Sequence, residues 1–179
     1  MTGITIRLSS ADDARSIAEF SQPIYVQIYP NEKYGMKPEH FSPAVFNTED
    51  TLEYFRHVFT NHARQRAYVA ERPGRIVGTI SIEHSGTYYD AHAFYVDPSM
   101  QGHGLGKELM QKALHFCTAD IPIRAEVAET NLKAIALYRH WGFRVAPELG
   151  LSLRHWPEWP EGLHNGYIFM IASRKDLHV

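Results

Sequence analysis

A glycine-rich segment in the middle of the chain constrains the fold most strongly. Residues 101–106 read Gln-Gly-His-Gly-Leu-Gly, and they separate a strand-like segment, 88–96, from a segment with helical periodicity, 106–117. Glycines at alternate positions let the backbone approach a ligand, and a helix N-terminus adds free amide groups and a positive partial charge. The segment indicates either a phosphate site or a strand-to-helix turn that needs positive φ.

Two common phosphate-binding loops do not fit this segment. A dinucleotide-binding fingerprint, GxGxxG, would need a third glycine where Lys107 stands, and a P-loop would need Ser or Thr where Glu108 stands. Both patterns are therefore excluded, and a nucleotide-binding protein that uses this loop is disfavoured.

The periodicity of the remaining chain predicts a mixed sequence of strands and helices. A strand followed by a helix and another strand around the glycine-rich segment predicts a parallel crossover. Pro23 should break the first helix, and a Pro-Gly turn should join two antiparallel strands. The expected elements are strands over 4–8, 67–71, 76–82, 88–96, 121–127 and 167–173, helices over 12–29, 49–63, 106–117 and 131–140, and irregular segments over 30–47 and 147–166.

Size and charge restrict the class of protein. A chain of 179 residues predicts one domain, 1–179. Eighteen Lys and Arg against 20 Asp and Glu give a net charge of -2, too balanced for the basic field that nucleic-acid binding requires. One cysteine, Cys117, cannot form an internal disulfide, which favours a reducing compartment and a cytoplasmic location. We expect no leader peptide and no membrane span, because every apolar run is short.

The glycine-rich segment resembles the QxxGxG motif of the GNAT superfamily of N-acetyltransferases, with Gln101, Gly104 and Gly106 on the motif positions. A later segment supports this resemblance. Asn131 opens a helical stretch, Tyr138 stands near its end, and Gly-Phe follows at 142–143, as in a second motif of that family. The two motifs occur in the family's order, and together they cover about residues 88–146.

The resemblance implies an α/β fold with a mixed, largely antiparallel sheet, helices on both faces and a splayed pair of parallel strands. It also implies that acetyl-CoA is the cosubstrate and that an acetyl group passes directly to a primary amine of a small molecule or a peptide. Tyr138 would protonate the departing thiolate, unless it is a core residue whose hydroxyl is tied to backbone. The residues implied to bind the cosubstrate are Tyr95, Val96, Gln101, Gly102, His103, Gly104, Leu105, Gly106 and Asn131, although Asn131 has an equal interpretation as a helix cap.

The group that deprotonates the amine is left open among three residues. Glu126 stands twelve residues before Tyr138, a spacing similar to the base and acid of ribosomal-protein N-terminal acetyltransferases in this superfamily. Asp90 stands near the position where histone-type members carry a catalytic Glu, and His92 is a third candidate. We favour Glu126, while each carboxylate could also be a solvated group at a strand end.

Three further expectations concern ligands, acceptor and assembly. Eleven histidines show no HExxH pattern or i, i+4 pair, so we expect no metal. The segment 147–166 could supply an aromatic and acidic wall for a cationic amine, or its tryptophans could cover the core. A catalytically silent acyl-CoA-binding regulatory module is the alternative function, and a homodimer is left open. The wall would comprise Trp156 and Trp159 with Glu148, Glu158 and Glu161.

Overall fold

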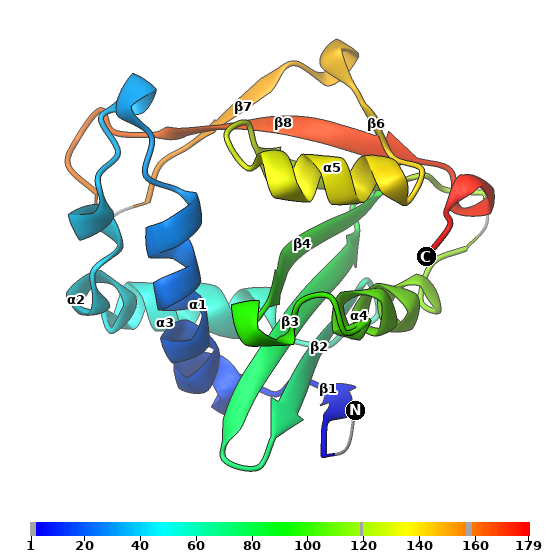
Figure 1. Ribbon diagram of the computed structural model, residues 1–179, viewed down its shortest axis with the longest axis horizontal. Coiled ribbons are helices and arrows are strands. Elements are labelled where there is room, and N and C mark those ends of the chain that lie inside the picture. The colour runs from blue at the N-terminus through cyan, green and yellow to red at the C-terminus, as the bar shows by residue number, and fades with distance from the viewer. Residues whose placement is uncertain (1–2, 119, 157–158) are drawn as a thin grey trace.

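A computed structural model describes residues 3–118, 120–156 and 159–179, and these residues form an eight-stranded sheet flanked by helices (Figure 1). The strands are β1 (Thr5–Leu8), β2 (Gln65–Arg72), β3 (Arg75–His84), β4 (Tyr89–Val96), β5 (Ile123–Ala128), β6 (Arg144–Val145), β7 (Leu151–Arg154) and β8 (Asn165–Ala172). The α-helices are α1 (Ala14–Ile28), α2 (Pro43–Phe46), α3 (Glu49–Val58), α4 (Leu105–Leu114) and α5 (Leu132–His140).

The sheet is mixed and largely antiparallel, as the sequence predicts. Its order is β1-β2-β3-β4-β5-β8-β6, with β7 also paired to β8. Within the described residues, the pairing between β4 and β5 is parallel and every other strand pairing is antiparallel. The crossover that joins β4 to β5 contains α4, so the predicted strand, helix and strand arrangement is confirmed.

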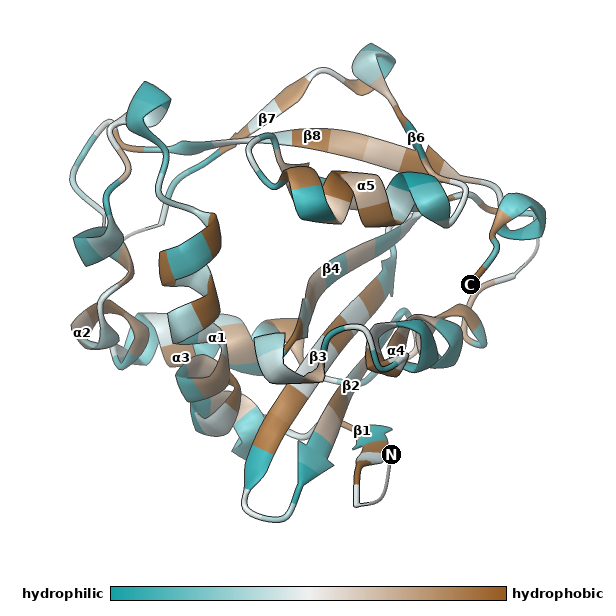
Figure 2. Cartoon of the chain, viewed as in Figure 1, coloured by the Kyte–Doolittle hydropathy of each residue, from teal (hydrophilic) through white to brown (hydrophobic). Residues whose placement is uncertain are grey.

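Helices cover both faces of the sheet. One core contains apolar residues of α4 and α5 packed on the sheet, and a second core contains apolar residues of α1 and α3 packed on the opposite face. Strand alternation explains the two cores, because Ala67 and Val69 of β2 enter one while Tyr68 and Ala70 enter the other. In Figure 2, β8 and the middle of β3 are hydrophobic. None of the helices in the described ranges is long and apolar enough to cross a membrane.

The parallel pair separates soon after it begins. The ladder between β4 and β5 joins only Tyr89–Ala91 to Ile123–Ala125. Beyond it, β4 carries one extra residue relative to β3, a β-bulge in which Ala93 adopts φ 49°. The Thr79 hydroxyl donates a 2.7 Å hydrogen bond to the Ala93 carbonyl and holds the bulge in place. The splayed pair that the resemblance implies is therefore present.

Several elements differ from the predictions. The segment 30–47 is not irregular throughout, since Pro43 starts the short helix α2 there. Helix α1 runs through Pro23 without a break, because buried residues on both sides of the proline, from Ile17 to Tyr25, pack against the core and override its helix-breaking tendency. The segment 147–166 is not irregular throughout, since it contains β7. Helix α3 ends at Val58 rather than near residue 63, where the chain turns back toward β2.

The single cysteine is a core residue. Cys117 follows α4 and is 3% exposed, and burial raises the pKa of its thiol to about 12. At neutral pH the thiol is therefore fully protonated, so Cys117 packs in the core as a small apolar residue.

The turn after α5 yields a test of the fold. Gly142 has φ 98°, and a Cβ there would overlap the Asp176 carbonyl oxygen of the C-terminal segment. We expect Gly142→Ala to lower the free energy of unfolding, measured in urea, by clearly more than the 1 to 2 kcal/mol or so that left-handed backbone costs a residue with a Cβ. Gly74→Ala is the matched control, since Gly74 has φ 83° and open space around it. Equal losses in the two variants would contradict the proposed contact.

Candidate active site

The glycine-rich loop is an exposed cradle at the start of α4. Gly104 is the N-cap of that helix with φ 87°, Gly102 has φ 77°, and neither has an atom within 4 Å of the place where a Cβ would stand. The first amides of a helix have no acceptor within the helix, so the N–H groups that follow Gly104 are available to a ligand. The His103 ring contacts the Gln101 carbonyl at 2.8 Å and stiffens the loop. This geometry suits an anion.

A phenylalanine connects the loop to α5. A Cβ on Gly106 would come 3.3 Å from the Phe94 ring, so glycine allows the helix to approach β4 closely. The Phe94 ring in turn lies 6.4 Å from the Tyr138 ring, measured between centroids. The predicted anion site and the predicted acid thus flank the same part of β4.

The gap between β4 and β5 leaves one edge of each strand without a partner strand. Tyr95 and Val96 pair with β3 on one side, while the ladder to β5 has ended four residues earlier, at Ala91. Backbone N–H and C=O groups along this gap can bind an extended ligand chain. The Tyr95 side chain points to the opposite face of the sheet from α4, where its hydroxyl lies 2.6 Å from that of Tyr29.

Tyr138 is buried on α5, and its ring packs against Trp141 and Phe143. Desolvation, and to a smaller extent the nearby Tyr29 phenol, raise the pKa of the Tyr138 phenol above its usual value. The group is therefore protonated at neutral pH and able to donate. Asn131 caps the same helix, because its side-chain oxygen accepts a 3.1 Å hydrogen bond from the Ala134 amide.

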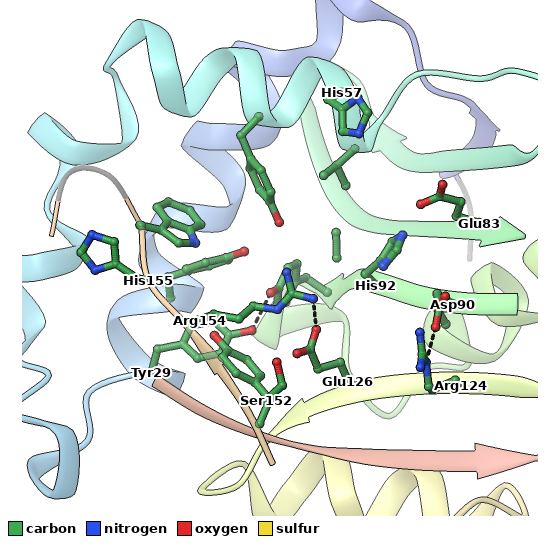
Figure 3. Close-up of a pocket in the computed structure, with 18 of the residues that line it drawn as sticks. Tyr29, His57, Glu83, Asp90, His92, Arg124, Glu126, Ser152, Arg154 and His155 are labelled. Atoms are coloured by element: carbon green, nitrogen blue, oxygen red, sulfur yellow. Dashed lines mark hydrogen bonds and ion pairs between the residues drawn. The ribbon is translucent and has the colours of Figure 1, made fainter. Parts of the chain in front are cut away.

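A cavity of 780 Å³ opens on the other face of the sheet (Figure 3). Its walls come from α1, α3, the strands β4 and β5, and the segment that contains β7. It combines a ring of aromatic side chains with several ionisable ones. The aromatic lining consists of Tyr25, Tyr29, Tyr54, Tyr95, Trp156, Tyr167 and Phe169, and the ionisable lining of Asp50, His57, Glu83, Asp90, His92, Arg124, Glu126, Arg154 and His155.

Two carboxylates predicted from the sequence line this cavity, each in an ion pair. Asp90 accepts a 2.5 Å hydrogen bond from Arg124, whose guanidinium also lies over the rings of Tyr88 and Phe169. One oxygen of Glu126, Oε2, accepts from Arg154, while Oε1 is buried with no hydrogen-bond partner among the described residues. Glu126 therefore retains an oxygen that a ligand could use.

His92 lines the cavity one residue before the bulge. Burial lowers the pKa of its imidazole below 6.5, an effect that the nearby Asp90, Glu83 and Glu126 carboxylates oppose and that Arg154 supports. The ring is therefore neutral at pH 7, and it can accept a proton as the sequence analysis allows. The described residues contain no group of three or more His, Cys, Asp or Glu side chains that could hold a metal ion.

The predicted wall in segment 147–166 needs correction. Trp156 lines the cavity, but Trp159 is buried against Phe41 and donates a hydrogen bond to the His40 carbonyl, so it covers the core. Glu148 pairs with Arg144 and is not part of the cavity lining. Glu161 is exposed and is also absent from that lining, and Glu158 falls outside the described residues.

Among the residues that shape the cavity, Arg154 and Tyr29 were not predicted from the sequence. Arg154 lies on β7, a strand inside a segment that was predicted to be irregular. Tyr29 directly follows the last residue of α1. Asn165, fully buried at the start of β8, joins these parts by donating a 3.1 Å hydrogen bond to the Tyr29 carbonyl. The alternation of Leu151 to Arg154 was the available signal for β7, and for Tyr29 there was none.

Comparisons with known proteins agree with this geometry. The model of the acetyltransferase (GNAT) family matches residues 27–143. A relative from Mycobacterium tuberculosis, the N-alpha-acetyltransferase RimI, is 31% identical over 158 residues, which are 86% of this chain and 84% of that protein.

Solved structures show the same fold. The PaiA N-acetyltransferase of Thermoplasma acidophilum in complex with coenzyme A superposes with a TM-score of 0.66, at 18% identity, over 96% of this chain and 99% of that one. The spermidine N-acetyltransferase of Vibrio cholerae in complex with CoA and spermine gives a TM-score of 0.63, at 18% identity, over 98% of each chain.

The loop geometry predicts the effect of a side chain at Gly104. We expect Gly104→Val to weaken acetyl-CoA binding, measured by calorimetry, about 10-fold or more, because each lost hydrogen bond to a charged phosphate costs roughly that much. Gly86→Val is the control, since Gly86 also has positive φ and open surroundings but lies in the turn before β4. Unchanged affinity in a folded Gly104→Val protein would remove the loop from the binding site.

Proposed function

This chain belongs to the acetyltransferase (GNAT) family, and we propose that it transfers the acetyl group of acetyl-CoA directly to a primary amine of a small molecule or a peptide. The observation that carries the proposal is the position of the gap between β4 and β5. The glycine-rich loop lies at one end of it, and the cavity opens on the face of the sheet opposite α4 and α5. A thioester held along the gap would meet an acceptor in the cavity.

The proposed reaction proceeds by direct attack. Glu126 takes a proton from the ammonium form of the acceptor, which gives the amine its lone pair. The amine nitrogen then bonds to the thioester carbonyl carbon, and the carbon–sulfur bond breaks with its electron pair on sulfur. Tyr138 gives its phenolic proton to this thiolate. The surplus proton on the new amide nitrogen leaves through solvent and restores the phenol, and Glu126 releases its proton to solvent before the next cycle.

Glu126 is favoured over Asp90 as the proton acceptor. Arg124 holds Asp90 and is itself held between two aromatic rings, so that pair is a fixed part of the wall. Glu126 has the oxygen Oε1, for which the described part of the chain supplies no donor, and a buried carboxylate oxygen without a donor gains free energy when an ammonium supplies one. His92, neutral and nearby, is the second candidate.

The cavity also suits a cationic acceptor. Four carboxylates line it against two guanidinium groups, so the carboxylates outnumber the guanidinium groups and favour a cation. The related proteins act on such amines according to their names, an N-alpha-amine in one case and spermidine in another. We further propose a cytoplasmic location, because the single cysteine of this chain is reduced and buried.

A silent acyl-CoA-binding module is the alternative. It would need the loop and the gap but neither Tyr138 nor Glu126. The two functions differ in one measurement, the release of free thiol from acetyl-CoA in the presence of a mixed set of amines. Release that depends on an amine supports the enzyme, and binding without release supports the module.

Tyr138→Phe tests the acid. Because the phenol is needed only as sulfur leaves, we expect kcat to fall about 10²- to 10⁴-fold while acetyl-CoA affinity stays nearly unchanged. The measurement is thiol release under saturating substrates, with calorimetry for affinity. The neighbouring ring offers a control in Phe143→Leu, which alters packing around Tyr138 but leaves the phenol. A wild-type rate in Tyr138→Phe would contradict the role.

Glu126→Gln tests the base. The variant should slow turnover at neutral pH, and its defect should shrink as pH rises, because a growing share of the acceptor is then already neutral. A pH profile of kcat/KM from pH 6 to 10 measures this. A large defect that persists at high pH would mean that Glu126 positions the acceptor and does not deprotonate it. Asp90→Asn serves as the control for loss of a carboxylate in the same cavity.

A further inference from the structure

The two arginines of the cavity differ in how many of their N–H donors are available to a ligand. Arg124 donates to Asp90 and is stacked at 4.6 and 5.1 Å from the ring centroids of Tyr88 and Phe169. Among the described residues, Arg154 has one hydrogen-bond partner, Glu126, and its side chain is 54% exposed. Since a guanidinium carries five N–H donors, most of those on Arg154 are available to a ligand.

The backbone places Arg154 firmly. β7 is paired with β8, and Arg154 lies opposite Asn165, which is fully buried and bonds to α1. Two residues later, the Trp156 ring packs among Tyr25, Phe46 and Tyr54, at centroid distances of 5.4 to 5.6 Å. The backbone is therefore anchored on both sides of Arg154, and Figure 3 shows the Arg154 side chain in the cavity, where its guanidinium pairs with Glu126.

The Glu126 carboxylate thus contacts Arg154 through Oε2, while its Oε1 has no hydrogen-bond donor among the described residues and Arg154 keeps further N–H donors. The pair offers a place for an ammonium on Glu126 directly beside a place for an oxygen on Arg154. In an α-aminoacyl group, the amine nitrogen and the carbonyl oxygen lie roughly 3 Å apart, given standard backbone bond lengths. Such a group could occupy both places at once.

Building on the function proposed above, we propose that the acceptor carries an α-aminoacyl group, as an amino acid or the amino terminus of a peptide does, and that Arg154 determines this specificity by binding its carbonyl or carboxylate oxygen. A simple amine or a polyamine can bind Glu126 through its ammonium group. It has no oxygen for Arg154, whose donors would then bond to water. The aromatic wall of Tyr25, Tyr54 and Trp156 would then pack against the first side chain of the acceptor.

A matched pair of acceptors tests this proposal. Phenylalaninamide and phenethylamine share the aromatic body and the primary amine, and they differ by the carboxamide that Arg154 would bind. We measure kcat/KM for both with the wild-type protein, Arg154→Gln and Arg154→Lys. Within each protein, the ratio of the two values cancels any effect of Arg154 on Glu126 that acts equally on both amines. Comparing this ratio between variants at one pH then removes the fixed difference in basicity between the two amines.

We expect the kcat/KM of phenylalaninamide divided by that of phenethylamine to fall about 10- to 100-fold in Arg154→Gln. The fall should come mainly from a higher KM for phenylalaninamide, because hydrogen bonds to a charged group are worth that much. Arg154→Lys should recover part of it, since an ammonium keeps the charge but loses the planar fork. Arg144→Gln is the control, an exposed arginine in an ion pair outside the cavity lining. Acetyl-CoA affinity should be unchanged in all variants.

The outcomes separate this proposal from the function on which it rests. Turnover of both amines with the same ratio in wild type and Arg154→Gln overturns the role of Arg154 and leaves the acetyltransferase intact. Absence of thiol release with every amine overturns both. Free phenylalanine adds a third arm, in which preference for the acid assigns a free amino acid, and preference for the amide assigns a peptide terminus.

Discussion

The short parallel ladder between β4 and β5 determines where everything else in the site can lie. Hydrogen bonding between the two strands stops after Ala91 and Ala125, and the bulge at Ala93 turns β4 away from its neighbour. Main-chain donors and acceptors left inside a protein are costly unless something bonds to them. A fold that separates two central strands in this way is stable only if water or an extended ligand fills the opening, and this opening is where we propose that the cosubstrate binds.

The two halves of the site have different origins in the chain. The proposed half for the cosubstrate comes from one continuous stretch, from β4 through the glycine-rich loop to α5. The proposed half for the acceptor combines β4 and β5 with α1, α3 and the segment around β7, which are far apart in sequence. The two meet on the cavity face of the sheet, where the Tyr29 and Tyr95 hydroxyls are 2.6 Å apart.

This division explains how much the sequence could predict. The loop at Gly104, the cap at Asn131 and the turn at Gly142 depend on local backbone geometry, so short patterns predicted their structure. Arg154 and Tyr29 reach the cavity only through tertiary packing, and the four residues of β7, between Gly150 and a proline, give too short an alternation to separate from a loop. The predicted helix break at Pro23 is wrong for the same reason, because the packing of α1 outweighs the tendency of proline to end a helix. The roles of Tyr138, Glu126 and Asn131 toward ligands are still predictions.

The burial of Cys117 has a practical consequence for chemistry on this protein. Reagents that detect or alkylate thiols react with the thiolate, and a thiol with a pKa of about 12 supplies almost none at the pH of such reactions. A disulfide-exchange dye added to the folded protein therefore reports coenzyme A alone, with no background from the polypeptide. Cys117 can also report unfolding. When no thioester is present, the rate at which the dye reacts with Cys117 measures how often the core around α4 opens to solvent.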